Sequence, residues 1–189
     1  MLDRLRGRLG SYLGTVGVAF SKVSPSPTSW TLVGLIASLL AALAYVSRGY
    51  IGELLGGLLI LVAGFFDIVD GAVARATERE SKRGAFLDSN LDRVAEVSIF
   101  LGILLGRHAS ALWVVLGLSA SLLVSYARAK GDSLGVTLSG VGVGERSERL
   151  LVLSIASLIG FAGWGVVLVA ILAALTYIER TWKATRWLG

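Results

Sequence analysis

The chain has 189 residues, of which 54% are hydrophobic and only 16% are charged, whereas about 25% of the residues of a typical soluble domain are charged. A soluble protein of this length could not bury so much apolar surface, so the composition excludes an ordinary soluble domain and predicts a polytopic, all-α integral membrane protein. The net charge of +5 does not predict nucleic-acid binding, because the basic residues gather at the ends of apolar segments, where cytoplasmic loops meet anionic lipid headgroups.

The first 22 residues carry apolar side chains at helical spacing, at Leu2, Leu5, Leu9, Tyr12 and Leu13. The arginines of this segment lie mostly off that stripe, and the segment lacks the continuous apolar core of a signal peptide. We therefore expect an N-terminal juxtamembrane amphipathic helix over residues 1–22 that lies on the membrane surface. The alternative is a cytosolic helix that packs on the rest of the domain.

Six apolar runs follow, and they predict six transmembrane helices in one membrane domain over residues 23–189. The runs are residues 31–46, 54–69, 94–105, 111–126, 150–161 and 166–178. Several are shorter than the roughly 20 residues that a span needs, so each short span must include its polar flank. Polar backbone at membrane depth is tolerated only where it lines a cavity. The lengths therefore predict a polar cavity that opens to one side.

The lysines and arginines are distributed unevenly between the two ends of these helices. Sixteen of the 18 lie at one set of ends, and only Arg48 and Arg107 lie at the other. Cytoplasmic ends carry an excess of Lys and Arg, so we expect both termini and the loop after the second span to face the cytoplasm from the cell membrane. An even number of spans agrees with termini on one side.

Four aspartates lie within 26 residues of this apolar chain, at Asp67, Asp70, Asp88 and Asp92. Their spacing, i,i+3 in the first pair and i,i+4 in the second, places each pair on one face of a helix. Carboxylates are costly at membrane depth, so four gathered there indicate a bound cation or a chemical role. The charge bias places this candidate active site on the cytoplasmic side.

Four carboxylates that converge from two helices can hold two divalent cations, an arrangement used for phosphoryl chemistry. The chain has no cysteine and one histidine, so the ligands would be oxygens, which suits Mg²⁺ or Mn²⁺. If three carboxylates hold metal, the fourth can act as general base toward an attacking hydroxyl. Gly71 and Gly84 let a ligand approach closely, and Arg75 is a fixed cation within reach of phosphate. The alternative is that the aspartates are helix caps and solvated charges.

The CDP-alcohol phosphotransferase family has a long signature that this stretch resembles position for position: Asp67-x-x-Asp70-Gly71-x-x-Ala74-Arg75-x8-Gly84-x-x-x-Asp88-x-x-x-Asp92. The resemblance implies an enzyme of phospholipid biosynthesis that transfers a phosphatidyl-type group from a CDP-linked lipid to an acceptor hydroxyl and releases CMP. It also implies two bound Mg²⁺ or Mn²⁺ ions, contact with membrane lipid, and a homodimer.

The resemblance further implies a role for each residue. Asp67, Asp70 and Asp88 would bind the two metal ions and the donor pyrophosphate, while Asp92 would be the catalytic base and would help to hold the metal. Residues 26–31 resemble the family's lead into its first span, although Thr28 stands where the family has Asn; the alternative is a helix start with Ser/Thr capping. Besides the aspartates, the expected CDP-donor-binding residues are Thr31, Gly71, Ala74, Arg75 and Gly84.

Two basic segments lie at the cytoplasmic ends of later spans, at residues 125–130 and 144–149. They indicate the chemical class of the acceptor. Guanidinium groups bind phosphate through paired hydrogen bonds, so a phosphorylated acceptor fits better than a neutral alcohol. The segments resemble those of phosphatidylinositol-phosphate and archaetidylinositol-phosphate synthases, although Tyr126 and Ser147 replace a lysine and a proline, and this resemblance implies inositol 1-phosphate as acceptor. The expected acceptor-phosphate-binding residues are Arg128, Lys130, Arg149 and Arg180.

Three alternatives stay open at this point. Glycerol 3-phosphate is also phosphorylated and would need the same arginines. The basic residues would otherwise serve only as positive-inside anchors and headgroup contacts. A protein of another class, a divalent-cation transporter, would use the aspartates as its permeation site, but it should carry polar groups through both halves of the membrane, whereas here they gather on the cytoplasmic side.

Overall fold

The computed structural model describes residues 13–189, and the regular structure of this part of the chain is entirely helical, which confirms the all-α prediction. A segment of residues 13–21 is helical. It is followed by α2 (Pro27–Val46), α3 (Tyr50–Ala76), α4 (Lys82–Gly106), α5 (Ala111–Ser133), α6 (Arg146–Leu158) and α7 (Ala162–Leu188). Each predicted apolar run lies wholly or largely inside one of these helices, and the helices extend into the polar flanks as expected.

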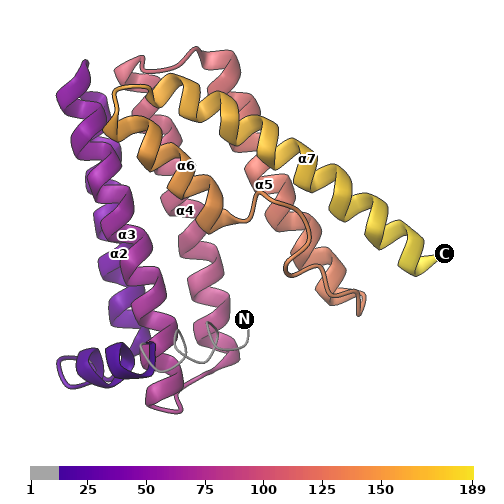
Figure 1. Ribbon diagram of the computed structural model, residues 1–189. Coiled ribbons are helices and arrows are strands. Elements are labelled where there is room, and N and C mark those ends of the chain that lie inside the picture. Colours follow the sequence, from indigo (N-terminus) through magenta and orange to yellow (C-terminus); the bar gives the residue numbers. More distant parts are fainter. Residues whose placement is uncertain (1–12) are drawn as a thin grey trace, which may run out of the picture.

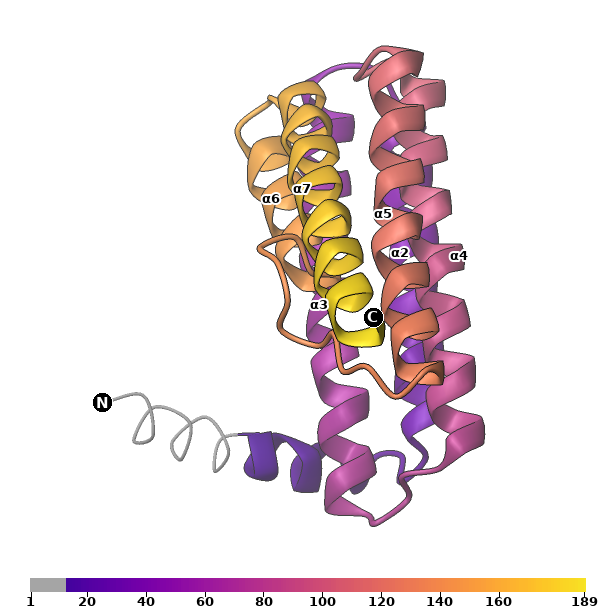
Figure 2. The same ribbon diagram turned by 90° about the vertical axis from the view of Figure 1, so that its right-hand side faces the viewer.

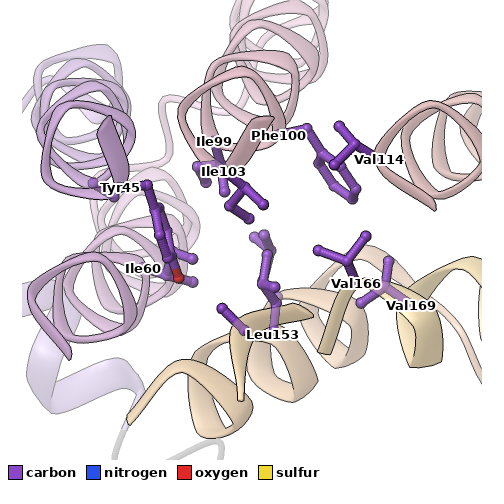
Figure 3. Packing of buried hydrophobic residues seen from close by; sticks show 12 residues of the cluster. Tyr45, Ile60, Ile99, Phe100, Ile103, Val114, Leu153, Val166 and Val169 are labelled. Atoms are coloured by element: carbon purple, nitrogen blue, oxygen red, sulfur yellow. The ribbon is translucent and has the colours of Figure 1, made fainter. Parts of the chain in front are cut away.

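Contacts between neighbours join the six helices into a ring whose spatial order differs from the chain order, and Figures 1 and 2 show these helices from two sides. Helix α2 packs on α3 and α4, α4 contacts α5, α5 packs on α7, α7 packs on α6, and α6 closes the ring on α3. Side chains from all six helices point into the middle of the ring, among them Tyr45 of α2, Phe100 of α4 and Leu153 of α6 (Figure 3). The ring therefore encloses one apolar core.

Close helix approach is a main source of packing energy where the surroundings are lipid, because lipid tails are as apolar as the side chains. Gly102 of α4 lies against the backbone of Ala42 in α2. Gly57 of α3 lies against α6, where a Cβ atom at this position would come 3.0 Å from the Ser154 carbonyl oxygen. Ser154 Oγ also donates to the Gly57 carbonyl at 2.8 Å. The α3–α6 contact thus combines close packing with a buried hydrogen bond.

Four of the described helices, α2, α3, α5 and α7, are long and apolar enough to cross a membrane. On α2, outward-facing side chains such as Leu39, Leu40 and Leu43 are exposed, and a large apolar surface of this kind requires lipid around it. The protein is therefore an integral membrane protein. Helix α4 has 25 residues with charges in its first turns. Helix α6 has 13 residues, a length of about 20 Å, which is less than the roughly 30 Å of a hydrocarbon core.

The helical segment of residues 13–21 lies crosswise to α2 and α3 at the end of the ring where α3 leads into α4 (Figures 1 and 2). The Phe20 ring contacts Trp30 of α2 and Phe65 of α3, with ring centroids 5.0 and 5.8 Å apart. These contacts anchor the segment on the ring. The predicted amphipathic helix covers residues 1–22, and four of its apolar positions lie outside the described residues: Leu2, Leu5, Leu9 and Tyr12.

A hydrogen-bonded cluster ties the opposite end of the ring together. His108 Nδ1 lies 3.0 Å from Glu53 Oε1, and His108 Nε2 lies 2.8 Å from the carbonyl oxygen of Tyr45. Glu53 Oε2 also accepts a hydrogen bond of 3.0 Å from the Ala162 N–H. His108, which the sequence analysis used only to exclude a histidine metal site, thereby joins the end of α2, the start of α3, the α4–α5 connection and, through Glu53, the start of α7.

Candidate active site

Three of the four predicted aspartates bring their carboxylates together. Asp67 of α3 and Asp88 and Asp92 of α4 each offer one oxygen, and these three atoms lie within 4.8 Å of one another. Asp88 Oδ1 is buried and has no hydrogen-bond partner among the described residues. Like charges this close repel one another strongly unless a cation lies between them. Oxygen ligands from two helices, one of them buried and unpaired, therefore fit a hard divalent cation such as Mg²⁺ or Mn²⁺.

Arg146, at the start of α6, inserts its guanidinium among these carboxylates. Its Nη1 lies 2.9 Å from Asp67 Oδ1 and 2.9 Å from Asp92 Oδ1. Arg146 was not among the residues predicted from the sequence, although it lies in the basic segment 144–149, three residues before Arg149. Its spacing from Arg149 gave a signal of a shared helix face, but only the packing of α6 brings it to the aspartates. The arginine supplies one positive charge at the centre of the cluster.

Asp70 points elsewhere, although it lies only one turn after Asp67. It is buried, and the Thr31 hydroxyl of α2 donates to Asp70 Oδ2 at 2.8 Å. Asp70 is not part of the three-carboxylate cluster. With Asp67, Asp92 and Arg146 it lines a narrow cavity between α2, α3 and α4. Asp70 is thus near the cluster, while its carboxylate is held by α2.

A cavity of about 490 Å³ lies between the start of α2, the end of α3 and the start of α4. Of the predicted donor-binding residues, it is lined by Thr31, Asp70, Gly71, Ala74, Gly84 and Asp88. Arg75 does not line this cavity and its guanidinium lies beside Gly71. Arg79 and Lys82, which the sequence analysis did not select, do line it. Both supply positive charge to a cavity that the acidic residues Asp70, Glu80 and Asp88 also line.

The local sequence explains why α4 begins where it does. Ser81 is the N-cap of α4, and its hydroxyl accepts a hydrogen bond of 3.0 Å from the Gly84 N–H. Serine is a preferred N-cap because it satisfies a backbone donor that has no partner inside the helix. Starting the helix at this point places Asp88 and Asp92 on successive turns of one face, toward Asp67.

A larger cavity of about 660 Å³ lies between α4, α5, α6 and α7, on the side of the ring where the C-terminal parts of α5 and α7 diverge from α2 and α3 (Figure 1). Three of the predicted acceptor residues, Arg128, Arg149 and Arg180, line it, and the fourth, Lys130, does not. The three carboxylates of the cluster line the same cavity, and so does Arg146. This space therefore joins the acidic cluster to a group of arginines.

Two of these arginines, Arg149 and Arg180, donate hydrogen bonds to other residues of the chain. Arg149 is 1% exposed; its Nη2 donates to Glu96 Oε1 at 2.8 Å and its Nη1 donates to the Gly144 carbonyl at 2.7 Å. Arg180 Nη2 donates to Glu145 Oε1 at 3.0 Å, and its Nε and Nη1 donate to backbone carbonyls. Arg128 is exposed and lies 4.0 Å from the carboxylate of Asp132. Neither Glu96 nor Glu145 was predicted from the sequence as a partner of these arginines.

Curated relatives of this chain carry related names. The archaetidylinositol phosphate synthase of Pyrococcus horikoshii is 36% identical over 186 residues, which are 98% of this chain and 97% of that protein. The archaetidylinositol phosphate synthase of Methanothermobacter thermautotrophicus is 38% identical over 79% of this chain and 78% of that protein. The phosphatidylinositol phosphate synthase of Streptomyces avermitilis is 40% identical over 73% of this chain and 57% of that protein.

Solved structures share the fold. The phosphatidylinositol phosphate synthase of Mycobacterium tuberculosis with CDP-DAG bound superposes with a TM-score of 0.75 and 25% identity, covering 91% of this chain and 92% of that chain. The same enzyme in complex with manganese and citrate gives a TM-score of 0.76 and 24% identity over 92% of this chain and 88% of that chain. The family model of CDP-alcohol phosphatidyltransferases matches residues 23–178. That range contains all four aspartates and every residue that lines the cavities of about 490 and 660 Å³, except Arg180. The chain therefore belongs to the CDP-alcohol phosphatidyltransferase family.

Proposed function

We propose that this transferase moves a phosphatidyl or archaetidyl group from a CDP-linked lipid to a hydroxyl of inositol 1-phosphate and releases CMP. The observation that carries the proposal is the position of Asp88, which lines both the cavity of about 490 Å³ and the cavity of about 660 Å³. A group transfer needs a donor and an acceptor held on two sides of one reacting centre. Two cavities that share a carboxylate supply that arrangement.

The cavity of about 490 Å³ is the proposed donor site. The glycines there leave backbone close to the space, and Arg79 and Lys82 add positive charge that complements a pyrophosphate. Thr31 holds Asp70 at the border of this cavity. The proposed metal ligands are Asp67, Asp70, Asp88 and Asp92. Two Mg²⁺ or Mn²⁺ ions, when bound, would neutralise the pyrophosphate oxygens and the charge that develops on the leaving CMP.

Asp92 is the proposed general base. It lines the cavity of about 660 Å³ and not the cavity of about 490 Å³, so its carboxylate faces the acceptor side. The carboxylate takes the proton of the acceptor hydroxyl, and the hydroxyl oxygen bonds to the phosphorus that carries the lipid. The bond from that phosphorus to the bridging oxygen breaks, and CMP leaves with the electron pair. Arg146 holds Asp92 Oδ1 at 2.9 Å and thereby orients the base.

The larger cavity is the proposed acceptor site. Arg128, Arg149 and Arg180 surround it, and three guanidinium groups favour an acceptor that brings its own phosphate over a neutral polyol. The names of the archaetidylinositol phosphate and phosphatidylinositol phosphate synthases among the relatives support inositol 1-phosphate. Lys130 lies outside this cavity, and we assign its positive charge to the membrane surface.

The membrane arrangement is part of the proposal. Helices α4 and α6 complete six spans, and the polar cavity beside the start of α6 compensates for the short length of that helix. The excess of Lys and Arg at one set of ends supports a cytoplasmic position of the active site and of both termini. The crosswise direction of residues 13–21 supports a surface helix over residues 1–22, ahead of a membrane domain over residues 23–189. The family resemblance supports a homodimer.

The first experiment measures CMP release by the purified full chain in detergent. The donors are CDP-diacylglycerol and CDP-archaeol, each with Mg²⁺ or Mn²⁺. The acceptors compared are inositol 1-phosphate, glycerol 3-phosphate, serine and free inositol. We expect turnover with inositol 1-phosphate. No CMP release with any acceptor would refute the transferase assignment, and turnover with inositol but not its phosphate would refute the arginine site.

A further inference from the structure

A buried ion pair joins Glu96 of α4 to Arg149 of α6, and Glu96 has no part in the proposed reaction. Glu96 is 0% exposed and Arg149 is 1% exposed. Glu96 lies one turn after Asp92 on α4, and Arg149 lies one turn after Arg146 on α6. The free energy lost when two charges are removed from water often exceeds the free energy gained from their attraction, so a buried ion pair often adds little to stability. Glu96 Oε2 moreover has no hydrogen-bond partner among the described residues.

The hydrogen bonds of Arg149 leave part of its guanidinium available. Nε and Nη2 both donate to Glu96 Oε1, at 3.3 and 2.8 Å, and Nη1 donates to the Gly144 carbonyl at 2.7 Å. A guanidinium has five N–H groups, so one N–H on Nη1 and one on Nη2 are not used in these three bonds. Those two N–H groups belong to adjacent nitrogens, the geometry that binds two oxygens of one phosphate.

Glu96 stands behind Arg149 as seen from the larger cavity. Arg149 lines that cavity and Glu96 does not. The carboxylates of Asp67 and Asp92 line the same cavity and would be alternative partners for Arg149 if Glu96 did not hold it. Arg180 differs in this respect, because two of its three hydrogen bonds go to backbone carbonyls, of Val141 and Val124. Two of the three hydrogen bonds of Arg149 go to Glu96 and one goes to the Gly144 carbonyl, so the direction of Arg149 depends mainly on one acidic side chain.

We propose that Glu96 is a positioning residue that fixes Arg149 for the phosphate of the acceptor. Glu96 does not touch the substrate; it aims two N–H groups of Arg149 into the cavity and keeps this arginine away from the catalytic carboxylates. A side chain that is already ordered loses less conformational freedom when the ligand binds. The inference deepens the proposed function and rests on it.

The variant Glu96→Gln keeps the shape of the side chain and removes its charge. We expect the KM for inositol 1-phosphate to rise about tenfold, because the freed arginine loses conformational entropy when it is ordered again on binding, and that loss weakens binding by about this factor. The KM for the CDP-linked lipid should stay within about twofold. Glu53→Gln is the matched control: it weakens another acidic–basic pair at the far end of the ring, so it should lower the melting temperature without changing the acceptor KM.

A double-mutant cycle separates positioning from structural support. If Glu96 acts through Arg149, then Glu96→Gln has no further effect on the acceptor KM once Arg149→Met is present. An equal rise in that background would overturn the inference. So would an unchanged acceptor KM in Glu96→Gln, or an equal rise of donor and acceptor KM. Each of these three results can be obtained while the natural chain still turns over inositol 1-phosphate, so the inference can fail while the proposed function stands. Absence of turnover by the natural chain would refute both.

Discussion

The position of Arg146 predicts that its charge competes with metal. Its Nη1 lies 2.9 Å from oxygens of both Asp67 and Asp92, two of the three carboxylates that come together. A divalent cation bound by these carboxylates must displace the guanidinium or tolerate its repulsion. We predict that Arg146→Gln binds Mn²⁺ more tightly than the natural chain when no substrate is present, and that it is less stable in EDTA, because Asp67 and Asp92 then lose their ion-pair partner.

The size of the expected gain in Mn²⁺ affinity follows from the exposure of the Arg146, Asp67 and Asp92 side chains. Opposite charges about 4 Å apart attract by about 1 kcal/mol in water and by about 4 kcal/mol at an effective dielectric constant of about 20. The Asp67 side chain is 39% exposed, so the value in water applies to that pair. Arg146 and Asp92 are 17% and 18% exposed, so their pair lies between the two values. Loss of both attractions amounts to at least about 2 kcal/mol, which corresponds to about 30-fold in Kd.

The assay is a titration of the full chain in detergent with Mn²⁺, in which electron paramagnetic resonance reports the free ion. Arg146→Lys keeps the positive charge and should stay near the natural Kd. Arg83→Gln removes an exposed positive charge from the start of α4 and should change the Kd little at moderate ionic strength, since exposed charges are screened. A Kd for Arg146→Gln within about twofold of the natural value, or an equal gain in Arg83→Gln, would contradict the competition.

Four further predictions follow from the site and the fold. Asp92→Asn should abolish CMP release, while donor binding and Mn²⁺ binding by the remaining ligands Asp67, Asp70 and Asp88 largely persist, and loss of donor binding would contradict its assignment as base. Thr31→Val should raise the donor KM about fivefold, because Asp70 loses a hydrogen bond worth about 1 kcal/mol, whereas Thr31→Ser should not. His108→Ala leaves Glu53 Oε1 without its partner while Oε2 keeps the Ala162 N–H, and it should lower the melting temperature by about 4–8 °C, the equivalent of about 2 kcal/mol, with an unchanged acceptor KM. EDTA should stop turnover, and added Mn²⁺ should restore it; persistent turnover in EDTA would refute the metal requirement.

The helices and their polar flanks were predictable because helical period and apolar run length are local properties of the chain. The i,i+4 spacing of Asp88 and Asp92 places both on one face whatever surrounds α4, and the structure has both facing Asp67. The N-cap Ser81 gives a local signal of the same kind. The limits of α6 were less predictable, since Leu158 rather than residue 161 ends the helix, and Gly160 adopts φ +79° just after it.

The positions of side chains around each helix depended on packing that no spacing reveals. Residues two apart on a helix point about 200° from each other, so when α5 turns Arg128 into the larger cavity, Lys130 points away from it. Asp70 is rotated by about 60° from Asp67, which is enough to bring it to Thr31 of α2 instead of the carboxylate cluster. Both outcomes follow from which neighbour each helix packs against.

The sequence by itself determined that this is a helical membrane protein with four aspartates on the ends of two helices and a basic group downstream, because composition, period and spacing act over a few turns. Only the tertiary structure decided which charges meet. Arg146 reaches Asp67 across 79 residues and Glu96 reaches Arg149 across 53 residues, and such pairs exist only because α6 packs back into the ring beside α3. Charge pairing over that separation is a property of the packed helices, since the unfolded chain brings these groups together only at a large cost in conformational entropy.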